Sequence, residues 1–322
     1  RQNPSDRRQV DGEVHQGDAI KRLRGQPGEK VTLTIGRPSL AQPKDFTLTR
    51  ADIRVATVKD IDNRKEFPVG ADKIGYVRLT QFGERTADEL EEALVKLEAK
   101  GMNALVMDLR GNPGGLLDQA VAVSEKFLER GQPIVSTEAR TSGNEVHRKA
   151  GTRGKARTVP MVVLVNGSSA SASEIVAGCL QDLKRAVIVG EQSFGKGSVQ
   201  SILPLTDGSA LRLTTAKYYT PSHKVIHEKG ITPDFSVPLS EDEEAAIQIR
   251  RIPGGKAAQQ DALKIFDADR QAALRDMVEN GRDAQLERAM DLLKAMNVLV
   301  KRDGDKAAPP AKKKDKPVRS LR

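Results

Sequence analysis

Ser171 is a candidate nucleophile because of where it lies in the sequence. It belongs to a serine-rich segment, 166–174, which follows the apolar run 161–165 and precedes a helical pattern. A serine at such a strand-to-helix turn presents its hydroxyl for attack, and the next backbone N–H helps to hold an oxyanion. The spacing of Ser171 and Glu174 is also that of a capping box, and from this segment alone helix capping is the favoured interpretation.

A glycine-rich turn has the same setting. Residues 108–115, Asp-Leu-Arg-Gly-Asn-Pro-Gly-Gly, follow a run of apolar residues and precede another helical pattern. Glycines at this point expose backbone N–H groups at the positive end of a helix, which suits an oxyanion or a phosphate. A tight turn that needs positive φ angles explains the glycines equally well.

Lys196 stands between two glycines in a third segment, Gly190–Ser198. The segment nearly matches a phosphate-binding loop, but Gly197 replaces the required Ser or Thr and the following residues indicate a strand instead of a helix. These departures argue against nucleotide binding. A lysine buried beside Phe194 and Val199 loses its charge more easily and acts as a base, whereas most lysines are simply exposed.

Other residue types narrow the chemistry. The alternative bases for a serine are His15, His147, His223 and His227, and no spacing in the sequence supports a Ser–His pair. Cys179 is the only cysteine, which excludes an internal disulfide and a cysteine-based zinc site.

The basic character of the chain is local. The net charge is +9, and the last 22 residues, with nine Lys or Arg and three Asp, carry +6 of it. Aromatic residues make up 3% and tryptophan is absent, so there is little material for stacking nucleic-acid bases. We therefore predict no nucleic-acid binding. The longest apolar run, 161–165, is too short to span a bilayer.

The elements that position these turns alternate between strand and helix from residue 73 onward. This alternation predicts an α/β core with a largely parallel sheet and crossover helices. The predicted strands are 74–82, 104–109, 133–139, 161–165 and 186–189, the predicted helices are 86–100, 116–130 and 171–182, residues 141–158 form a predicted loop, and 198–237 are β-rich. We expect Thr86 and Glu89 to open the first of these helices as a capping box.

Less regular segments flank this core. We predict four regions: a small α/β segment over 1–58, the core over 59–240, a helical region over 241–300 and a disordered basic tail over 301–322. Within the flanks we expect a frayed start at 1–9, a helix at 18–23, paired strands at 30–35 and 45–50, a short helix at 241–250, a break at 253–256 and helical structure over 261–299.

Together the three turns resemble those of the carboxy-terminal processing (tail-specific) serine proteases. The stretches that carry the resemblance are Gly75–Leu79, Asp108–Gly115, Ser169–Gly178, Gly190–Gln200, Tyr218–Pro221 and Lys229–Asp234, and Gln285–Lys294 is similar to this family's C-terminal helix. The resemblance covers about half of the chain and implies a ClpP/crotonase-like protease core.

On this resemblance Ser171 is the nucleophile, Lys196 the general base and Gln200 the residue that orients the lysine amine. The amine must be uncharged to take a proton, so we expect Lys196 to be buried. In an ideal strand residues 196 and 200 lie about 13 Å apart, so we expect the chain to bend at Gly197.

The resemblance also implies an oxyanion hole. It consists of the Ala172 N–H and the N–H of either Gly114 or Gly115, two alternatives that the sequence leaves open. No metal or cofactor is implied.

Residues 10–49 resemble the latter part of a PDZ domain, through Val10-Asp11-Gly12 and the helix and strand that follow. The earlier strands of such a domain, and its loop for a terminal carboxylate, have no counterpart in residues 1–9. We therefore expect a partial PDZ segment in a truncated chain.

The expected function is that of a serine endopeptidase. It cleaves proteins near apolar, unstructured C-termini, in the periplasm or another exported location, and its partners are such substrates and an adaptor protein. The alternative is a catalytically inactive or gated peptide-binding scaffold on the same fold. Two further hypotheses are a homo-oligomer formed through the C-terminal helices and contact of the basic tail with an anionic membrane surface.

Overall fold

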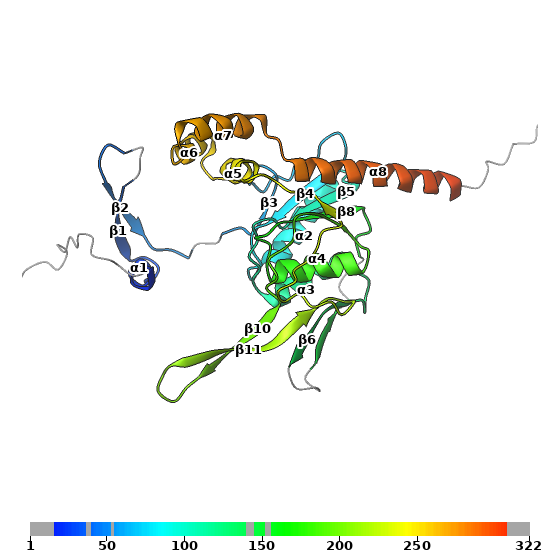
Figure 1. Cartoon of the computed structure of the whole chain (residues 1–322), viewed down its shortest axis with the longest axis horizontal. Helices are drawn as coiled ribbons and strands as arrows, with labels where there is room; N and C mark the ends of the chain where they lie inside the picture. The colour runs from blue at the N-terminus through cyan, green and yellow to red at the C-terminus, as the bar shows by residue number, and fades with distance from the viewer. Residues whose placement is uncertain (1–15, 37–39, 53–54, 140–144, 152–155, 308–322) are drawn as a thin grey trace, which may run out of the picture.

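The computed structural model describes residues 16–36, 40–52, 55–139, 145–151 and 156–307. The predictions for 1–9, for Val10-Asp11-Gly12, for His15 and for the tail from residue 308 lie outside the described residues. Figure 1 shows a central α/β body, with a small hairpin unit on one side, the C-terminal helices above and a long hairpin below.

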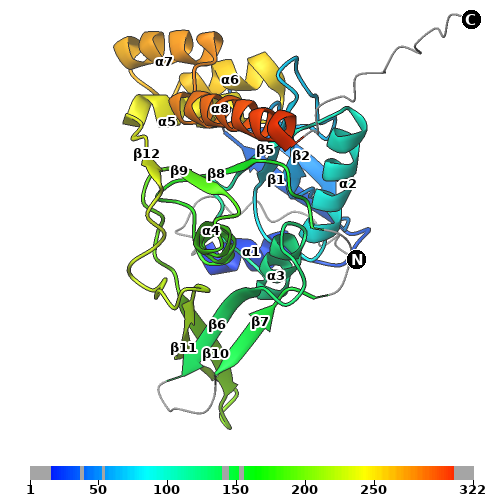
Figure 2. The same cartoon turned by 90° about the vertical axis from the view of Figure 1, so that its right-hand side faces the viewer.

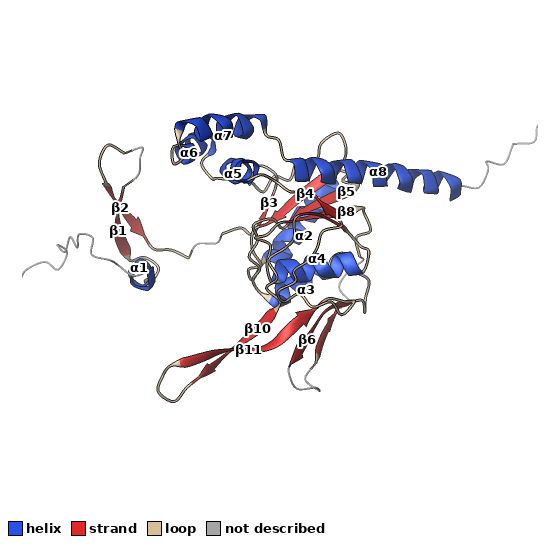
Figure 3. Cartoon of the chain, in the orientation of Figure 1, coloured by secondary structure: helices blue, strands red, loops and turns tan. Residues whose placement is uncertain are grey.

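The body is built on a six-stranded sheet with the order β12-β9-β8-β5-β4-β3 (Figure 3). Its strands are β3 (Val58–Lys59), β4 (Ile74–Leu79), β5 (Ala104–Asp108), β8 (Met161–Val165), β9 (Val187–Gly190) and β12 (Phe235–Ser236). β3 pairs antiparallel with β4, and the other pairs are parallel, which confirms the largely parallel sheet. Every residue of β5 and β8 is buried, because both faces of these central strands are covered.

Helices cover both faces of this sheet (Figure 2). The helices are α2 (Thr86–Ala99), α3 (Leu117–Glu125), α4 (Ala172–Asp182) and α8 (Ala284–Ala307). α2, α3 and α4 enclose the main hydrophobic core, which includes Met107 of β5 and Val163 of β8. α8 packs on the other face, where Val106 and Leu164 contribute to a second core. Successive strand residues point to opposite faces, so each strand serves both cores.

A second sheet is antiparallel, in the order β10-β11-β6-β7. Its strands are β10 (Ser198–Pro204), β11 (Ala210–Tyr219), β6 (Pro133–Ala139) and β7 (Val146–Lys149). β10 and β11 form the hairpin that extends from the body in Figure 1. The predicted loop over 141–158 is wrong at β7, whose four residues are all exposed and become a strand by pairing with β6.

The N-terminal unit consists of α1 (Gln16–Leu23) and an antiparallel pair, β1 (Lys30–Ile35) and β2 (Lys44–Thr49). These elements agree with the predicted helix and strands to within two residues.

The C-terminal region contains α5 (Glu241–Arg250), α6 (Gly255–Leu263) and α7 (Ala268–Asn280) before α8. The predicted break at 253–256 is too long, because α6 already begins at Gly255. The predicted disordered tail is wrong over 301–307, which continue α8. The helix predicted over 116–130 ends at Glu125. In the described part of the chain, no helix combines the length and apolar character needed to cross a membrane.

The capping box predicted for α2 is also wrong. Arg85 is the N-cap residue, and its side chain makes no capping hydrogen bond. The Thr86 hydroxyl accepts the Gly83 N–H at 2.9 Å, and the Glu89 carboxylate accepts the Thr57 N–H at 2.7 Å. Glu89 therefore ties β3 to α2 instead of capping its own helix.

Candidate active site

Ser171 lies at the start of α4 in a strained conformation. Its backbone angles are φ 56° and ψ −113°, a combination that non-glycine residues rarely adopt. Ser171 is the N-cap residue of this helix, and the predicted capping box between Ser171 and Glu174 is present. Glu174 supplies the other side of the predicted capping box, because its carboxylate accepts the Ser171 N–H at 2.7 Å. The cap uses the Ser171 hydroxyl oxygen only as an acceptor, so its proton stays available for transfer to a base.

The serines on either side of Ser171 have structural partners. Ser169 is buried, and its Oγ donates to the Leu109 carbonyl oxygen at 2.8 Å. Ser173 is also buried, and its Oγ donates to the Asn112 carbonyl oxygen at 2.9 Å. Both bonds tie the serine-rich segment to the glycine-rich turn. These contacts distinguish Ser171 from its neighbours.

Gly114 brings the glycine-rich turn directly against Ser171. Its φ is +97°, and a methyl group on it would lie 2.6 Å from the Ala170 carbonyl oxygen and 2.7 Å from the Ser171 Cβ. The same methyl group would lie 2.9 Å from the Ala172 nitrogen. Glycine is thus required both for the backbone conformation and for the close approach. The two turns identified in the sequence meet at one place.

The backbone N–H groups expected in an oxyanion hole differ in their partners. The Gly114 N–H donates to Asn112 Oδ1 at 2.9 Å. In the part of the chain that the structure describes, the N–H groups of Gly115 and Ala172 have no hydrogen-bond acceptor. Gly115 packs on Phe82, whose carbonyl oxygen accepts the N–H of the following residue, Leu116.

The buried carboxylate of Glu174 joins the serine to the lysine segment. Its Oε2 accepts both the Ser171 N–H at 2.7 Å and the Lys196 N–H at 2.9 Å. Its Oε1 accepts the Gly195 N–H and the Ser193 hydroxyl, each at 2.6 Å. Because one oxygen binds both backbones, Ser171 and Lys196 are held as close neighbours.

Sequence reasoning missed this role of Glu174 and gave it only a place in a capping box. A signal was present, since Glu174 is the one acid in a run of α4, Ala172–Leu180, that is buried throughout. A carboxylate in such a run needs several donors to offset its loss of water.

Lys196 departs from the expectation of burial. The residue is exposed, and the neighbouring Phe194 is 68% exposed, so no apolar pocket encloses the lysine side chain. Gly195, the residue before the lysine, has a φ of +89°. Gly197, where we predicted a bend, packs closely against the backbone of His227.

Gln200 is not brought to Lys196. It is exposed in β10, opposite Thr214 and beside an irregularity in the strand register at Val199 and Gln200. No hydrogen bond among the described residues joins Gln200 to Lys196. β10 begins two residues after the lysine, and it forms one edge of its sheet.

The histidines lie elsewhere. His147 is an exposed residue of β7, and His223 stacks on the ring of Tyr219. His227 adjoins Gly197, and its Nδ1 is buried without a hydrogen-bond partner among the described residues. None of these three side chains has a hydrogen bond to Ser171 in the structure described.

The described residues contain neither a reactive cysteine nor a group of side chains suited to bind a metal ion. Burial raises the pKa of the Cys179 thiol to about 12, so the thiol stays protonated at neutral pH and is a poor nucleophile. No cluster of three or more His, Cys, Asp or Glu side chains suited to a metal ion occurs in the described part of the chain.

Comparison with known proteins identifies the family. Residues 73–237, which span both βα turns and the lysine segment, match Peptidase family S41. The chain belongs to peptidase family S41. This confirms the resemblance on which the roles of Ser171 and Lys196 were predicted.

Named relatives within family S41 are carboxy-terminal processing proteases. The chain is 46% identical over 242 residues to the carboxy-terminal-processing protease of Bartonella bacilliformis, covering 73% of this chain and 54% of that protein. It is 41% identical over 218 residues to the carboxyl-terminal-processing protease of a Synechocystis strain, covering 67% and 49%. The chain therefore spans about half the length of the curated relatives it matches.

A solved S41-like structure has the same fold. The photosystem II D1 C-terminal processing protease matches with a TM-score of 0.51 and 32% sequence identity. The match covers 74% of this chain and 63% of that one. The mixed α/β architecture predicted from the sequence is thus confirmed.

Proposed function

We propose that this chain is a serine endopeptidase of the C-terminal processing type, with Ser171 as nucleophile and Lys196 as general base. The observation that carries the proposal is the bridge made by Glu174, whose single oxygen Oε2 accepts the backbone N–H of both residues. The strained backbone of Ser171 supports it further, because such strain persists only where surrounding contacts enforce it.

In the proposed reaction, Lys196 in its neutral form takes the proton of the Ser171 hydroxyl as Oγ attacks a peptide carbonyl carbon. The tetrahedral intermediate carries a negative oxygen, which the N–H groups of Ala172 and Gly115 stabilise. The lysine then gives its proton to the departing amine as the C–N bond breaks. Water attacks the acyl-enzyme in a second, equivalent step with Lys196 again as base.

Gly115 is our choice over Gly114 for the oxyanion hole. The Gly114 N–H already donates to Asn112 Oδ1 at 2.9 Å, whereas the Gly115 N–H has no acceptor among the described residues. Gly114 serves the site by letting the turn approach Ser171.

Because Lys196 is exposed in the structure, we infer that the bound substrate itself shields the lysine amine from water. A peptide that covers the lysine turn removes water from the amine, and this favours the neutral form that the reaction requires. We infer that the site is completed when substrate binds and that Gln200 orients the lysine only in that closed state.

The preference for apolar, unstructured tails follows from the surface beside Lys196. β10 is an edge strand that begins next to the lysine, and an extended peptide pairs readily with such an edge. The hairpin also exposes apolar side chains: Leu203 and Leu211 are directly paired across the strands and are 44% and 47% exposed. A folded substrate does not offer an extended strand, so an unstructured segment is the better fit.

The test is digestion of an unfolded protein with an apolar C-terminus, with the products identified by mass spectrometry. We expect Ser171→Ala and Lys196→Ala each to abolish cleavage while circular dichroism shows an intact fold. The matched controls are Ser168→Ala and Lys229→Ala, which change exposed residues of the same types near the site. If purified Ser171→Ala or Lys196→Ala still cleaved the substrate, the proposal would be wrong.

A second candidate is a peptide-binding scaffold without catalysis. The exposure of Lys196, together with its lack of a hydrogen bond to Gln200 in the described residues, favours it. A fluorescent peptide with an apolar end distinguishes the two, because an enzyme cleaves it whereas a scaffold binds it saturably and leaves it intact.

The setting of the enzyme is part of the same proposal. We infer an exported location, an adaptor that delivers substrates and self-association through α8. The last of these is supported by Val298 and Leu299, which are 55% and 58% exposed near the end of that helix.

A further inference from the structure

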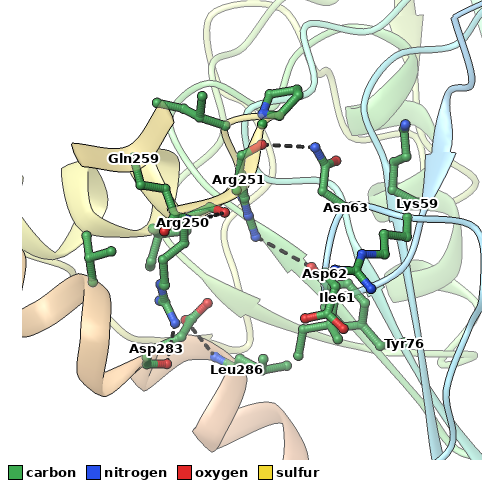
Figure 4. Close-up of a pocket in the computed structure, with 18 residues that line it drawn as sticks. Lys59, Ile61, Asp62, Asn63, Tyr76, Arg250, Arg251, Gln259, Asp283 and Leu286 are labelled. Carbon is green, nitrogen blue, oxygen red and sulfur yellow. Dashed lines mark hydrogen bonds between the residues drawn. The ribbon is translucent and has the colours of Figure 1, made fainter. Parts of the chain in front are cut away.

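A cavity lies between the C-terminal helices and the sheet, lined by none of the residues assigned to the protease site. Its volume is about 740 Å³. Figure 4 shows the side chains that line it. Its lining includes Lys59 of β3, Tyr76 of β4, Arg251 after α5, and Gly254 and Gly255 at the start of α6.

Asp108 is the centre of a buried charge network beneath this cavity. The residue is fully buried, and its Oδ2 accepts the Tyr76 hydroxyl at 2.7 Å and the Arg251 guanidinium at 2.6 Å. Arg110 forms ion pairs with both Asp108, at 2.6 Å, and Asp283, at 2.9 Å. These contacts hold the pKa of Asp108 well below its usual range despite burial, because Arg110 and Arg251 stabilise the ionised form.

Two more arginines, Arg78 and Arg250, add positive charge to this network, and neither forms an ion pair with a carboxylate among the described residues. Arg78 stands opposite Asp108 in the strand register, but its side chain makes no hydrogen bond or ion pair among the described residues. The two terminal nitrogens of Arg250 donate hydrogen bonds to the carbonyl oxygens of Gly281 and Arg282. Burial lowers the pKa of both guanidinium groups. The lining of the cavity itself holds four cationic side chains, Lys59, Arg64, Arg250 and Arg251, and two carboxylates, Asp62 and Asp283.

Three buried nitrogens in this network have no acceptor. Arg251 Nη1, Arg250 Nε and Arg78 Nε are inaccessible to solvent and unpartnered within the described residues. The Arg251 side chain is only 11% exposed and points into the space shown in Figure 4. A buried donor without an acceptor is destabilising. Arg250 and Arg251 line the cavity, so a small rotation of either guanidinium group toward a bound oxygen atom would give its unpartnered nitrogen an acceptor, whereas Arg78 does not line the cavity.

The start of α6 faces the same cavity. Gly254 is the N-cap residue, and no side chain caps the helix. The first N–H groups of a helix lack partners within it, and they attract anions. Lys59, which also lines the cavity, forms no ion pair among the described residues. A helix end, a lysine and the guanidinium groups of Arg250 and Arg251 thus lie around one space.

We propose that this cavity binds a small phosphate dianion, either inorganic phosphate or the phosphate group of a phosphomonoester. Two negative charges match the excess of two positive charges in the lining of the cavity, whereas a carboxylate would compensate only one. Three phosphate oxygens can accept from donors on separate elements, α5 and α6 included. The proposal does not depend on the chemistry of Ser171.

The test is calorimetric titration of the full chain with inorganic phosphate, at constant ionic strength maintained with sodium chloride. We expect saturable binding at one site per chain. Arg251→Gln and Lys59→Gln each weaken it about tenfold or more, because each removes a charged donor. The control Arg148→Gln removes the same charge from β7, far from the cavity in Figure 2, and leaves the affinity unchanged.

Lys59→Gln keeps the test decisive if Arg251→Gln fails to fold, since Lys59 has no ion pair to lose. A parallel titration with O-phosphoserine separates the two sources: tighter binding than inorganic phosphate identifies a phosphomonoester, and weaker binding identifies free phosphate. The proposal is overturned if wild type shows no saturable binding of either probe, or if both cavity variants bind as wild type does.

Discussion

At the scale of single residues, the position of the proposed dyad depends on Glu174. Its carboxylate accepts four hydrogen bonds, from Ser171, Ser193, Gly195 and Lys196. A carboxylate offers acceptors on both oxygens, whereas an amide offers one acceptor and one donor. No amide side chain of this size can therefore accept the same four hydrogen bonds.

We predict that Glu174→Gln destabilises the fold by about 1–3 kcal/mol, because its NH₂ group faces N–H or O–H donors. Cleavage falls at least tenfold, since the lysine turn loses its attachment to the serine turn. Urea unfolding and the digestion assay measure the two effects. Glu241→Gln, which changes an acid with a side chain 95% exposed, is the control and leaves both unchanged. Wild-type activity in Glu174→Gln would contradict the role of the bridge.

At the scale of elements, two strand-to-helix turns dock through Gly114. We predict that Gly114→Ala costs about 2–5 kcal/mol, from positive-φ strain and from overlap with Ala170 and Ser171. Gly131→Ala is a matched control, because Gly131 has a similar φ of +86° but nothing within 4 Å of the added methyl group. It costs about 1–2 kcal/mol, the strain alone. Thermal unfolding and digestion of both variants check this, and equal losses in the two would show that the close approach is unimportant.

The sequence predicts those elements that are stabilised by their own residue pattern. It misses those that depend on contacts with distant parts of the chain. β6 and β8 have the predicted bounds. Apolar residues extend across the whole of β8, and β6 contains the β-branched residues Ile134, Val135 and Thr137, which favour strands. β7 was missed because its residues are mostly polar and all exposed, and only pairing with β6 makes it a strand. The capping box at α2 failed for the same kind of reason, since Glu89 binds Thr57, a residue 32 positions away.

At the scale of the whole molecule, the C-terminal helices connect to both sites. Glu244 of α5 accepts the Asn166 side-chain N–H at 2.8 Å, and Asn166 Oδ1 accepts the Gly111 N–H of the glycine-rich turn at 2.9 Å. The other end of α5 supplies Arg250 to the cavity. Local patterns predicted the turns but not these links, because Arg110 and Asp283, for example, are 173 residues apart in the chain.

The stability of the whole molecule responds to pH through Glu91. Hydrogen bonds from Arg157, at 2.6 and 3.1 Å, lower the pKa of Glu91 from 4.5 to about 2, with a further contribution from Lys126 at 2.9 Å. These contacts join α2 to the segments before β8 and after α3. Because the folded-state pKa lies below the ordinary value, the stabilisation is complete above about pH 4.5 and is lost as the pH falls toward 2.

We predict that Glu91→Gln lowers the free energy of unfolding at pH 7 by up to about 1 kcal/mol, a modest value because the Glu91 side chain is 42% exposed. Urea unfolding at pH 7, 5 and 3 measures the difference from wild type, which is constant between pH 7 and 5 and shrinks at pH 3. The control is Glu92→Gln, whose parent side chain is 63% exposed and pairs with Arg85 only at 3.9 Å, and it shows no difference at any of these pH values. If Glu91→Gln remained equally destabilised at pH 3, the stabilisation would not come from the charge of Glu91, and the methylene contacts of its side chain would have to account for it.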